Sequence, residues 1–260
     1  MIKIQETSKQ QITDSILSNQ ALLLDFDGTL VDYAQGERDA LDNLFTYCNL
    51  SKELFSEAKE YYKQGNAYYW SEFEKKNFTI DEVQKKRFED LINKFSLTND
   101  PLDLNEKYLQ FFIKSTSIDP KVIAALSEIK EMGVKLIVIT NGIHWTQAER
   151  IKACGLNKII DNFFTSESVG FAKPHPKMFT DSEEFLKSIN CSTENLWVVG
   201  DNFEADIKGA YDVGFNTCWI NNSNNHNKTE QSINSDNSYP TMIASDFLEF
   251  AEFYKNIKSN

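Results

Sequence analysis

The sequence predicts an α/β fold: a Rossmann-like parallel sheet with helices on both faces and a small helical segment inserted after the first strand. Short continuous apolar runs, such as Ala21–Leu24 and Leu136–Ile139, alternate with amphipathic helical patterns along most of the chain. Such runs, bounded by polar residues or glycine, are typical of strands buried on both faces, as in parallel sheets. Between residues 33 and 117 these runs stop and only helical spacing is found.

The size and composition of the chain are compatible with a core and a smaller insert. It has 260 residues, of which 41% are hydrophobic, enough to fill a sizeable core. Its 27 basic and 39 acidic side chains give a formal net charge of −12, which argues against nonspecific binding to nucleic acids or anionic membranes. With no signal-peptide pattern and no membrane-length apolar run, we expect a cytoplasmic protein without nucleic-acid or membrane partners. The four cysteines form no C-x-x-C pair and are expected to be reduced thiols.

The first predicted strand carries two acids at its carboxyl end. Asp25 and Asp27 follow Ala21–Leu24 directly. Open α/β sheets bind their ligands at this end of their strands. We therefore expect chemistry here.

The insert is predicted to be a separate helical domain of residues 33–117, with a core domain of residues 1–32 and 118–260. Its apolar residues recur at helical spacing: Leu41, Leu44, Phe45 and Cys48, and later Phe88, Leu91, Ile92 and Phe95. A group of aromatic residues is interpreted as part of its core, with base stacking as the alternative: Tyr61, Tyr62, Tyr68, Tyr69 and Trp70.

Sheet and helix alternate again after the insert. Asp119 is the expected N-cap, and Pro120 the first residue, of a helix that ends at Gly133. Its inward face is predicted to be Val122, Ala125, Leu126, Ile129 and Met132. A strand over 134–139 follows, and then a helix that carries Ala148, Ile151 and Cys154 and ends at Gly155.

The same rhythm continues to the carboxyl end of the chain. Further strands are predicted at 163–165, 196–199 and 217–220 and near Met242. The predicted helices are 176–189, with Phe179, Ser182, Leu186 and Ile189 inward, one through Ala205 and Ala210, and 247–257. The stretch 221–238, rich in Asn and Ser, predicts a loop.

Polar clusters lie at the carboxyl ends of three predicted strands and in one loop. They are Asp25 with Asp27, Thr140 with Asn141, Asp201, and Lys173 in a strand-to-helix loop. Because equivalent ends of parallel strands face the same side of a sheet, these residues can converge on one crevice.

Three carboxylates in one crevice would be unstable without a cation. Hard oxygen ligands suit Mg²⁺ better than zinc, and the metal would let a phosphate dianion approach. Lys173 adds positive charge, while Thr140 and the turn after it offer a hydroxyl and backbone N–H groups to phosphoryl oxygens. Asp25 can then act as nucleophile at phosphorus, and Asp27 can donate a proton to the leaving oxygen.

Together, the clusters resemble the four ordered motifs of haloacid dehalogenase-like (HAD) phosphohydrolases. The matching segments are Asp25–Leu30, Thr140–Gly142, Lys173–Pro174 and Gly200–Asp206. The resemblance implies Asp25 as nucleophile and Asp27 as acid and base, with Thr140 and Lys173 as further catalytic residues. It also implies Mg²⁺ held by Asp25, the Asp27 carbonyl and Asp201, with Asn202 and Asp206 in support. The expected substrate-binding residues are Gly28, Thr29, Thr140, Asn141, Gly142 and Lys173, and the insert resembles the family's small mobile cap.

A narrower likeness is to the pyrimidine 5′-nucleotidase-like branch of that family. It rests on the segments Ser166–Pro174, Gly200–Asp206 and Thr217–Asn221. Asn202 stands where Ser or Thr is more usual, and N-acylneuraminate-9-phosphatases share several of these features. We therefore expect a Mg²⁺-dependent phosphomonoesterase that hydrolyses a small phosphorylated metabolite through an aspartyl phosphate, with a nucleoside 5′-monophosphate favoured.

Alternative functions stay open at this point. A sugar-phosphate phosphatase of the N-acylneuraminate-9-phosphatase kind and a phosphomutase would use the same residues. A dehalogenase would use Asp25 on carbon and would leave Asp27 and Asp201 without a role. From a different class, a receiver-like or non-catalytic phosphate-binding protein is the alternative, although receivers are far shorter. The sequence does not determine the oligomeric state, and a monomer is slightly favoured.

Overall fold

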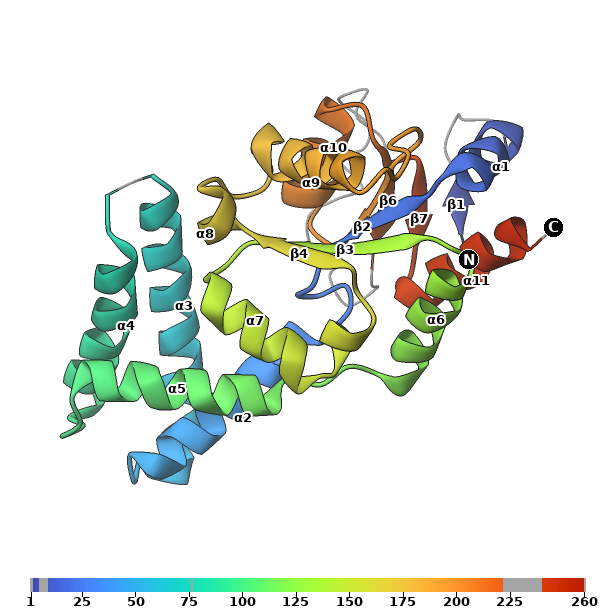
Figure 1. Cartoon of the computed structure of the whole chain (residues 1–260). Coiled ribbons are helices and arrows are strands. Elements are labelled where there is room, and N and C mark those ends of the chain that lie inside the picture. The colour runs from blue at the N-terminus through green and yellow to red at the C-terminus, as the bar shows by residue number, and fades with distance from the viewer. Residues whose placement is uncertain (1, 5–8, 76, 222–239, 260) are drawn as a thin grey trace. The chain divides into compact units, whose positions relative to one another are not determined.

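The structure, a computed structural model, describes residues 2–4, 9–75, 77–221 and 240–259. The chain divides into two compact units (Figure 1). Unit 1 comprises Met1–Asp32 and Ser117–Asn260, and unit 2 comprises Tyr33–Thr116. Most of the loop predicted over 221–238 lies outside the described residues.

Unit 1 is built on a sheet whose described strands run in the order β1-β7-β6-β5-β2-β3-β4. Their bounds are β1 Lys3–Ile4, β2 Ala21–Leu24, β3 Lys135–Thr140, β4 Asn162–Thr165, β5 Trp197–Gly200, β6 Asn216–Ile220 and β7 Met242–Ala244. All pairs are parallel except β1 with β7. The predicted parallel sheet is confirmed, and the antiparallel edge strand β1 was not predicted.

Helices cover both faces of the sheet. Successive residues of each strand point to opposite faces, so each strand contributes side chains to two apolar clusters. Leu22 and Leu24 of β2 pack in one apolar cluster and Leu23 packs in the other. The first cluster includes residues of α1 (Lys9–Ser18), α6 (Pro120–Glu131), α7 (His144–Ala153) and α11 (Phe247–Lys258). The second includes residues of α9 (Pro176–Ser188) and α10 (Gly209–Asp212). Figure 1 shows α9 and α10 above the sheet, and α6, α7 and α11 below it.

The predicted helix ends are largely confirmed. Asp119 Oδ1 accepts a 2.8 Å hydrogen bond from the Lys121 N–H, and α6 begins at Pro120. Two residues predicted to face inward are instead exposed: Met132 by 38% and Ile189 by 40%. Both are the C-cap residue of their helix, where the chain leaves the helical path and the side chain no longer follows the buried face.

Three features of unit 1 differ from the expected elements. The helix α1 precedes the first predicted strand, although its sequence is mostly polar. The helix expected through Ala205 and Ala210 is a π-helical segment, Phe203–Lys208, followed by the short α10. A short helix, α8 (Ser166–Val169), and a 3₁₀ turn, Leu156–Lys158, complete the connections.

Unit 2 is helical throughout its described elements, as predicted for the insert. It contains α2 (Tyr33–Tyr47), a 3₁₀ turn (Lys52–Leu54), α3 (Phe55–Glu74), α4 (Ile80–Phe95) and α5 (Pro101–Ser115). Tyr62 and Tyr69 are buried, which supports their interpretation as core residues, whereas Tyr68 is 55% exposed. No helix in the described part of the chain is long and apolar enough to cross a bilayer.

A buried cation lies inside unit 2. The guanidinium of Arg87 donates to the side-chain carbonyls of Asn66 and Asn105, at 2.9 and 2.7 Å. It also lies over the rings of Tyr62, Phe88 and Tyr108. The buried Glu37 carboxylate is close enough for Arg87 to act against the rise that burial causes in its pKa.

Candidate active site

The neighbouring parallel strands β3, β2 and β5 bring three predicted clusters to one edge of the sheet. Asp25 follows β2, Thr140 ends β3, and Asp201 follows β5. Leu24, the last residue of β2, pairs with Val138 on one side and with Val199 on the other, so Asp25 lies beside the last residues of β3 and β5. The Asp25 N–H continues this ladder with a 2.9 Å hydrogen bond to the Val199 carbonyl.

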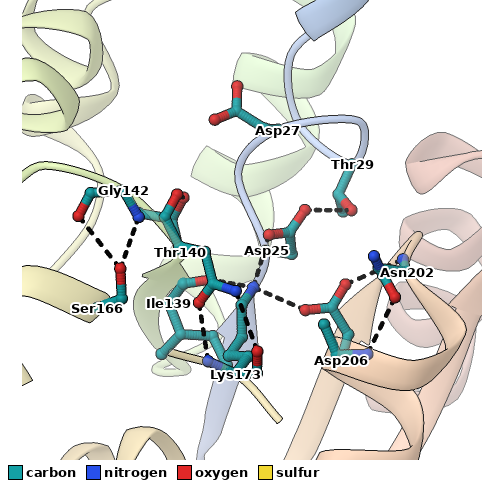
Figure 2. A network of polar contacts seen from close by, with 12 residues as sticks. Asp25, Asp27, Thr29, Ile139, Thr140, Gly142, Ser166, Lys173, Asn202 and Asp206 are labelled. Atoms are coloured by element: carbon teal, nitrogen blue, oxygen red, sulfur yellow. Dashed lines mark hydrogen bonds and ion pairs between the residues drawn. The ribbon is translucent and has the colours of Figure 1, made fainter. Parts of the chain in front are cut away.

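The carboxylate of Asp25 is buried and held at both oxygens (Figure 2). Lys173 Nζ lies 2.7 Å from Oδ1, and Thr29 Oγ1 donates to Oδ2 at 2.9 Å. Thr29, predicted to bind substrate, is therefore used here to orient Asp25. A carboxylate fixed in this way presents one defined oxygen geometry to a reaction partner.

Lys173 lies at the centre of the polar network in Figure 2. Besides Asp25, its ammonium contacts Asp206 Oδ1 at 2.6 Å and donates to the Ile139 carbonyl at 2.8 Å. The Asn141 side chain holds the Lys173 backbone in place: it accepts from the N–H at 2.8 Å and donates to the carbonyl at 3.1 Å. Asn141 thus fixes the loop that supplies the lysine.

Asp25, Asp201 and Asp206 form an acidic cluster in which each offers a carboxylate oxygen within 4.8 Å of the others. Three carboxylates against the single ammonium of Lys173 leave a formal charge of −3 + 1 = −2. Gly28, at φ +93°, makes room for it: a Cβ there would lie 2.4 Å from Asp201 Oδ2. Hard oxygen donors with excess negative charge fit a hard divalent cation.

The pKa values of Asp25, Asp201 and Lys173 all differ from their usual values. Burial raises the pKa of Asp25 well above its usual value, and Asp206 and Asp201 add to the rise while Lys173 opposes it. Burial also raises the pKa of Asp201 to about 6, with a further contribution from Asp206. The pKa of Lys173 is raised, because the attraction of Asp206 and Asp25 outweighs the opposing effect of burial.

Asp206, predicted to support the metal site from outside, lies in direct contact with Lys173. Its Oδ2 accepts from the Asn202 N–H at 3.0 Å, while Oδ1 contacts Lys173. Asn202 in turn accepts from the Ala205 N–H at 2.9 Å and so begins the π-helical segment. The two predicted supporting residues are thus joined in one turn, with Asp206 inside the acidic cluster.

The carboxylate of Asp27 is held by two residues that the sequence analysis did not identify. Arg150 Nη2 and Nη1 contact Asp27 Oδ1 and Oδ2 at 2.6 and 2.8 Å, and Gln147 Nε2 donates to Oδ2 at 3.0 Å. In Figure 2 the Asp27 side chain lies apart from the network of Lys173. Both partners come from α7; their spacing of three residues on a predicted helix was a signal that they share one face.

The Thr140–Gly142 turn makes contacts of its own. Thr140 is buried, and its hydroxyl oxygen accepts from Gln147 Nε2 at 2.8 Å. The Gly142 N–H, expected among the phosphate-binding groups, donates to the Ser166 hydroxyl at 2.8 Å, as Figure 2 shows. Ser166 therefore joins this turn to the start of α8.

The family model for haloacid dehalogenase-like hydrolases matches residues 20–214. The chain belongs to the haloacid dehalogenase-like hydrolase family. It is 32% identical to YfnB of Bacillus subtilis (strain 168) over 78% of this chain and 84% of that protein. A crystal structure of YfnB bound to magnesium matches with a TM-score of 0.72 at 29% identity, over 91% of this chain and 98% of that one.

Two further relatives of this HAD-like hydrolase are named as pyrimidine 5′-nucleotidases. YjjG of Escherichia coli (strain K12) is 28% identical over 70% of this chain and 84% of that protein. PynA of Streptococcus pneumoniae (strain R6) is 27% identical over 80% of this chain and 86% of that protein. The family predicted from the four motifs is thereby confirmed, and the chain is a hydrolase.

Proposed function

We propose that this HAD-like hydrolase is a Mg²⁺-dependent phosphomonoesterase that uses Asp25 as nucleophile and acts on nucleoside 5′-monophosphates. The observation that carries the proposal is the environment of Asp25. Its carboxylate is oriented by Lys173 and Thr29 and lies next to the oxygens of Asp201 and Asp206. A fixed carboxylate beside a set of hard oxygen donors suits attack on phosphorus near a divalent cation.

In the proposed reaction Asp25 attacks the phosphorus atom and the ester oxygen leaves, giving an aspartyl phosphate that water then hydrolyses. Lys173 donates hydrogen bonds to Asp25 and to the Ile139 carbonyl and forms an ion pair with Asp206, so it orients the nucleophile and offsets charge. Thr140 is proposed to donate its hydroxyl to a phosphoryl oxygen. Asp27 is proposed to give a proton to the leaving oxygen and to take one from the attacking water.

Asp25 and Asp201, with the Asp27 carbonyl and support from Asp206, are the residues proposed to hold Mg²⁺. When bound, the ion supplies positive charge that lowers the repulsion between the carboxylates and a phosphate dianion. The raised pKa values of Asp25 and Asp201 support this proposal, because burial and the neighbouring carboxylates disfavour their ionised forms more than Lys173 favours them. The magnesium-bound crystal structure of YfnB supports the choice of metal.

The substrate class rests on the relatives named as pyrimidine 5′-nucleotidases, YjjG and PynA. A sugar-phosphate phosphatase with the same nucleophile is the competing substrate assignment. A panel of pyrimidine and purine 5′-monophosphates and sugar phosphates, assayed for phosphate release with Mg²⁺, separates the two. Preference for uridine or thymidine monophosphate supports the nucleotidase assignment, and preference for a sugar phosphate contradicts it.

The nucleophile is tested with Asp25→Asn. An amide cannot form the aspartyl phosphate, so kcat should fall by at least about 1,000-fold. The matched control is Asp181→Asn, whose carboxylate lies in an exposed pair with Lys177 and should leave kcat unchanged. Full activity of Asp25→Asn, or of the wild type in excess chelator, would refute the proposed mechanism.

A further inference from the structure

Arg150 presents an unusual combination of burial and charge. Its side chain is only 2% exposed, yet it carries a guanidinium and lies on a helix that packs against the sheet. A buried charge is costly unless it is paired and hydrogen-bonded. Here the pairing is with Asp27, through two parallel contacts of 2.6 and 2.8 Å. Such a bidentate pair fixes the plane of the carboxylate as well as its position.

The fold provides a seat for this guanidinium. The Cζ atom of Arg150 lies 4.9 Å from the centroid of the Phe26 ring. Phe26 is fully buried in the core of unit 1. Phe26 stands between the two site carboxylates in sequence, so the residue that separates Asp25 from Asp27 also supports the partner of Asp27. The strand end and α7 are thereby joined through Arg150.

Gln147 locks the arrangement from a second side. Its Oε1 accepts from Arg150 Nη1 at 2.8 Å, and its Nε2 donates to both Asp27 and Thr140. A flipped amide would place an oxygen against the Asp27 carboxylate, so this orientation follows from its partners. Gly142 permits it: a Cβ at this residue would lie 3.2 Å from Gln147 Nε2.

We infer that Arg150 and Gln147 are positioning residues that set the orientation of Asp27 for proton transfer. The inference rests on the proposed function, in which Asp27 exchanges protons with substrate and water. Three of the roughly four lone-pair sites of the Asp27 carboxylate are occupied by these two side chains, which leaves one direction for a reaction partner.

The proton transfers are consistent with this role. Asp27 gives its proton to the leaving oxygen as the ester bond breaks, and the resulting carboxylate is the form that a guanidinium binds with both oxygens. The attacking water then returns a proton to Asp27 as its oxygen bonds to phosphorus, and the bond between phosphorus and the Asp25 oxygen breaks. Arg150 and Gln147 act in these steps through their contacts with Asp27.

The test compares two aryl phosphates that differ in their need for a proton. The leaving group of phenyl phosphate needs protonation much more than that of 4-nitrophenyl phosphate. We expect Arg150→Met to lower kcat about 100-fold on phenyl phosphate but only about 10-fold on 4-nitrophenyl phosphate, as expected when acid–base help is lost. The matched control is Lys152→Met on the same helix, whose exposed ammonium pairs only loosely with Glu149; it should change neither rate.

A double-mutant cycle separates positioning from a structural role. If Arg150 acts through Asp27, the variant carrying both Asp27→Asn and Arg150→Met should have the kcat of Asp27→Asn alone, within about twofold. Equal losses on both esters, or losses that multiply in the double variant, would overturn the inference.

Gln147→Leu is used as a second variant if Arg150→Met does not fold. It removes a neutral side chain and leaves the ion pair between Arg150 and Asp27 in place. It should lower kcat on phenyl phosphate about 10-fold. The variant carrying both Gln147→Leu and Asp27→Asn should have the kcat of Asp27→Asn alone. Failure of the inference is distinguishable from failure of the proposed function: in the latter case the wild type releases no phosphate from either ester, or Asp25→Asn remains active.

Discussion

Lys173 is the residue on which the geometry of the candidate site depends most directly. Its ammonium is buried and holds one oxygen of Asp25 and one of Asp206, each within 2.7 Å. Without it, two buried carboxylates would face each other with no positive charge between them. Removing one partner of a buried ion pair lowers the free energy of unfolding far more than removing one partner of an exposed pair.

We therefore expect Lys173→Met to lower both activity and stability. The free energy of unfolding should fall by about 3–5 kcal/mol, and kcat by at least about 100-fold, because Asp25 loses its orienting contact. Lys177→Met is the matched control: its exposed pair with Asp181 should contribute less than about 1 kcal/mol. Urea denaturation and phosphate release measure the two effects. A Lys173→Met protein as stable as the control would contradict the assigned role of the ion pair.

The sequence indicated some site residues much better than others. Asp25 and Asp201 could be predicted because each directly follows a buried strand, and parallel strands bring such residues to one edge. Arg150 and Gln147 lie on a helix, where the direction of a side chain depends on how the helix packs. In that packing the Arg150 guanidinium lies over the Phe26 ring. The linear sequence does not show that these two residues are close in space. The contact between Gly142 and Ser166 likewise depends on where α8 begins.

At the scale of elements, the helix α4 of unit 2 carries a charge into an aromatic core. Arg87 is buried among three rings and two asparagine carbonyls. Helices of this kind obtain most of their stability from the packing of one face. A polar group on that face is retained at low cost only when its hydrogen bonds are made.

We predict that Arg87→Met destabilises unit 2 by about 3 kcal/mol, because Glu37, Asn66 and Asn105 lose a buried partner. Lys85→Met, which removes a surface pair with Glu89 on the same helix, should change stability by less than about 0.5 kcal/mol. Chemical denaturation followed by circular dichroism gives both values. Equal stability of the two variants would show that the buried guanidinium is dispensable.

Elements with a strong apolar period were predicted, and elements without one were not. The strands β2, β3, β5 and β6 and the helices α6, α9 and α11 follow from runs and periodicity. The helix α1 has only two buried apolar residues, Ile12 and Ile16, in a polar context, and β1 has only two residues. The π-helical turn at Phe203–Lys208 contains Asp206, whose contact with Lys173 is a tertiary contact that the linear sequence does not show.

At the scale of the whole molecule, the stability of the protein should be linked to pH and Mg²⁺ through the acidic cluster. An unfolded Asp titrates near 3.8, whereas folding raises the pKa of Asp201 to about 6 and also raises that of Asp25. Between these values the folded state binds more protons than the unfolded state. The contribution of these groups to the free energy of unfolding therefore falls as pH rises through about 6.

Magnesium should reverse this loss, since the proposed site binds the ion through the ionised carboxylates of the folded protein. We expect saturating Mg²⁺ to raise Tm by several degrees at about pH 7.5 and by distinctly less at about pH 5, where protons compete for the same oxygens. Differential scanning calorimetry with Mg²⁺ or with chelator measures the shift at each pH. All buffers are free of Ca²⁺. The Asp201→Asn variant serves as the control, and Mg²⁺ should raise its Tm less than that of the wild type at both pH values. A shift that does not depend on pH would exclude this linkage.

The salt bridge between Asp25 and Lys173 joins segments that are 148 residues apart along the chain. Local helices re-form quickly when denaturant is diluted, but an ion pair between such distant segments can exist only once the strands between them have assembled in register. Turnover regained during refolding should therefore lag behind the far-ultraviolet signal. Catalysis in this molecule is a late reporter of native topology.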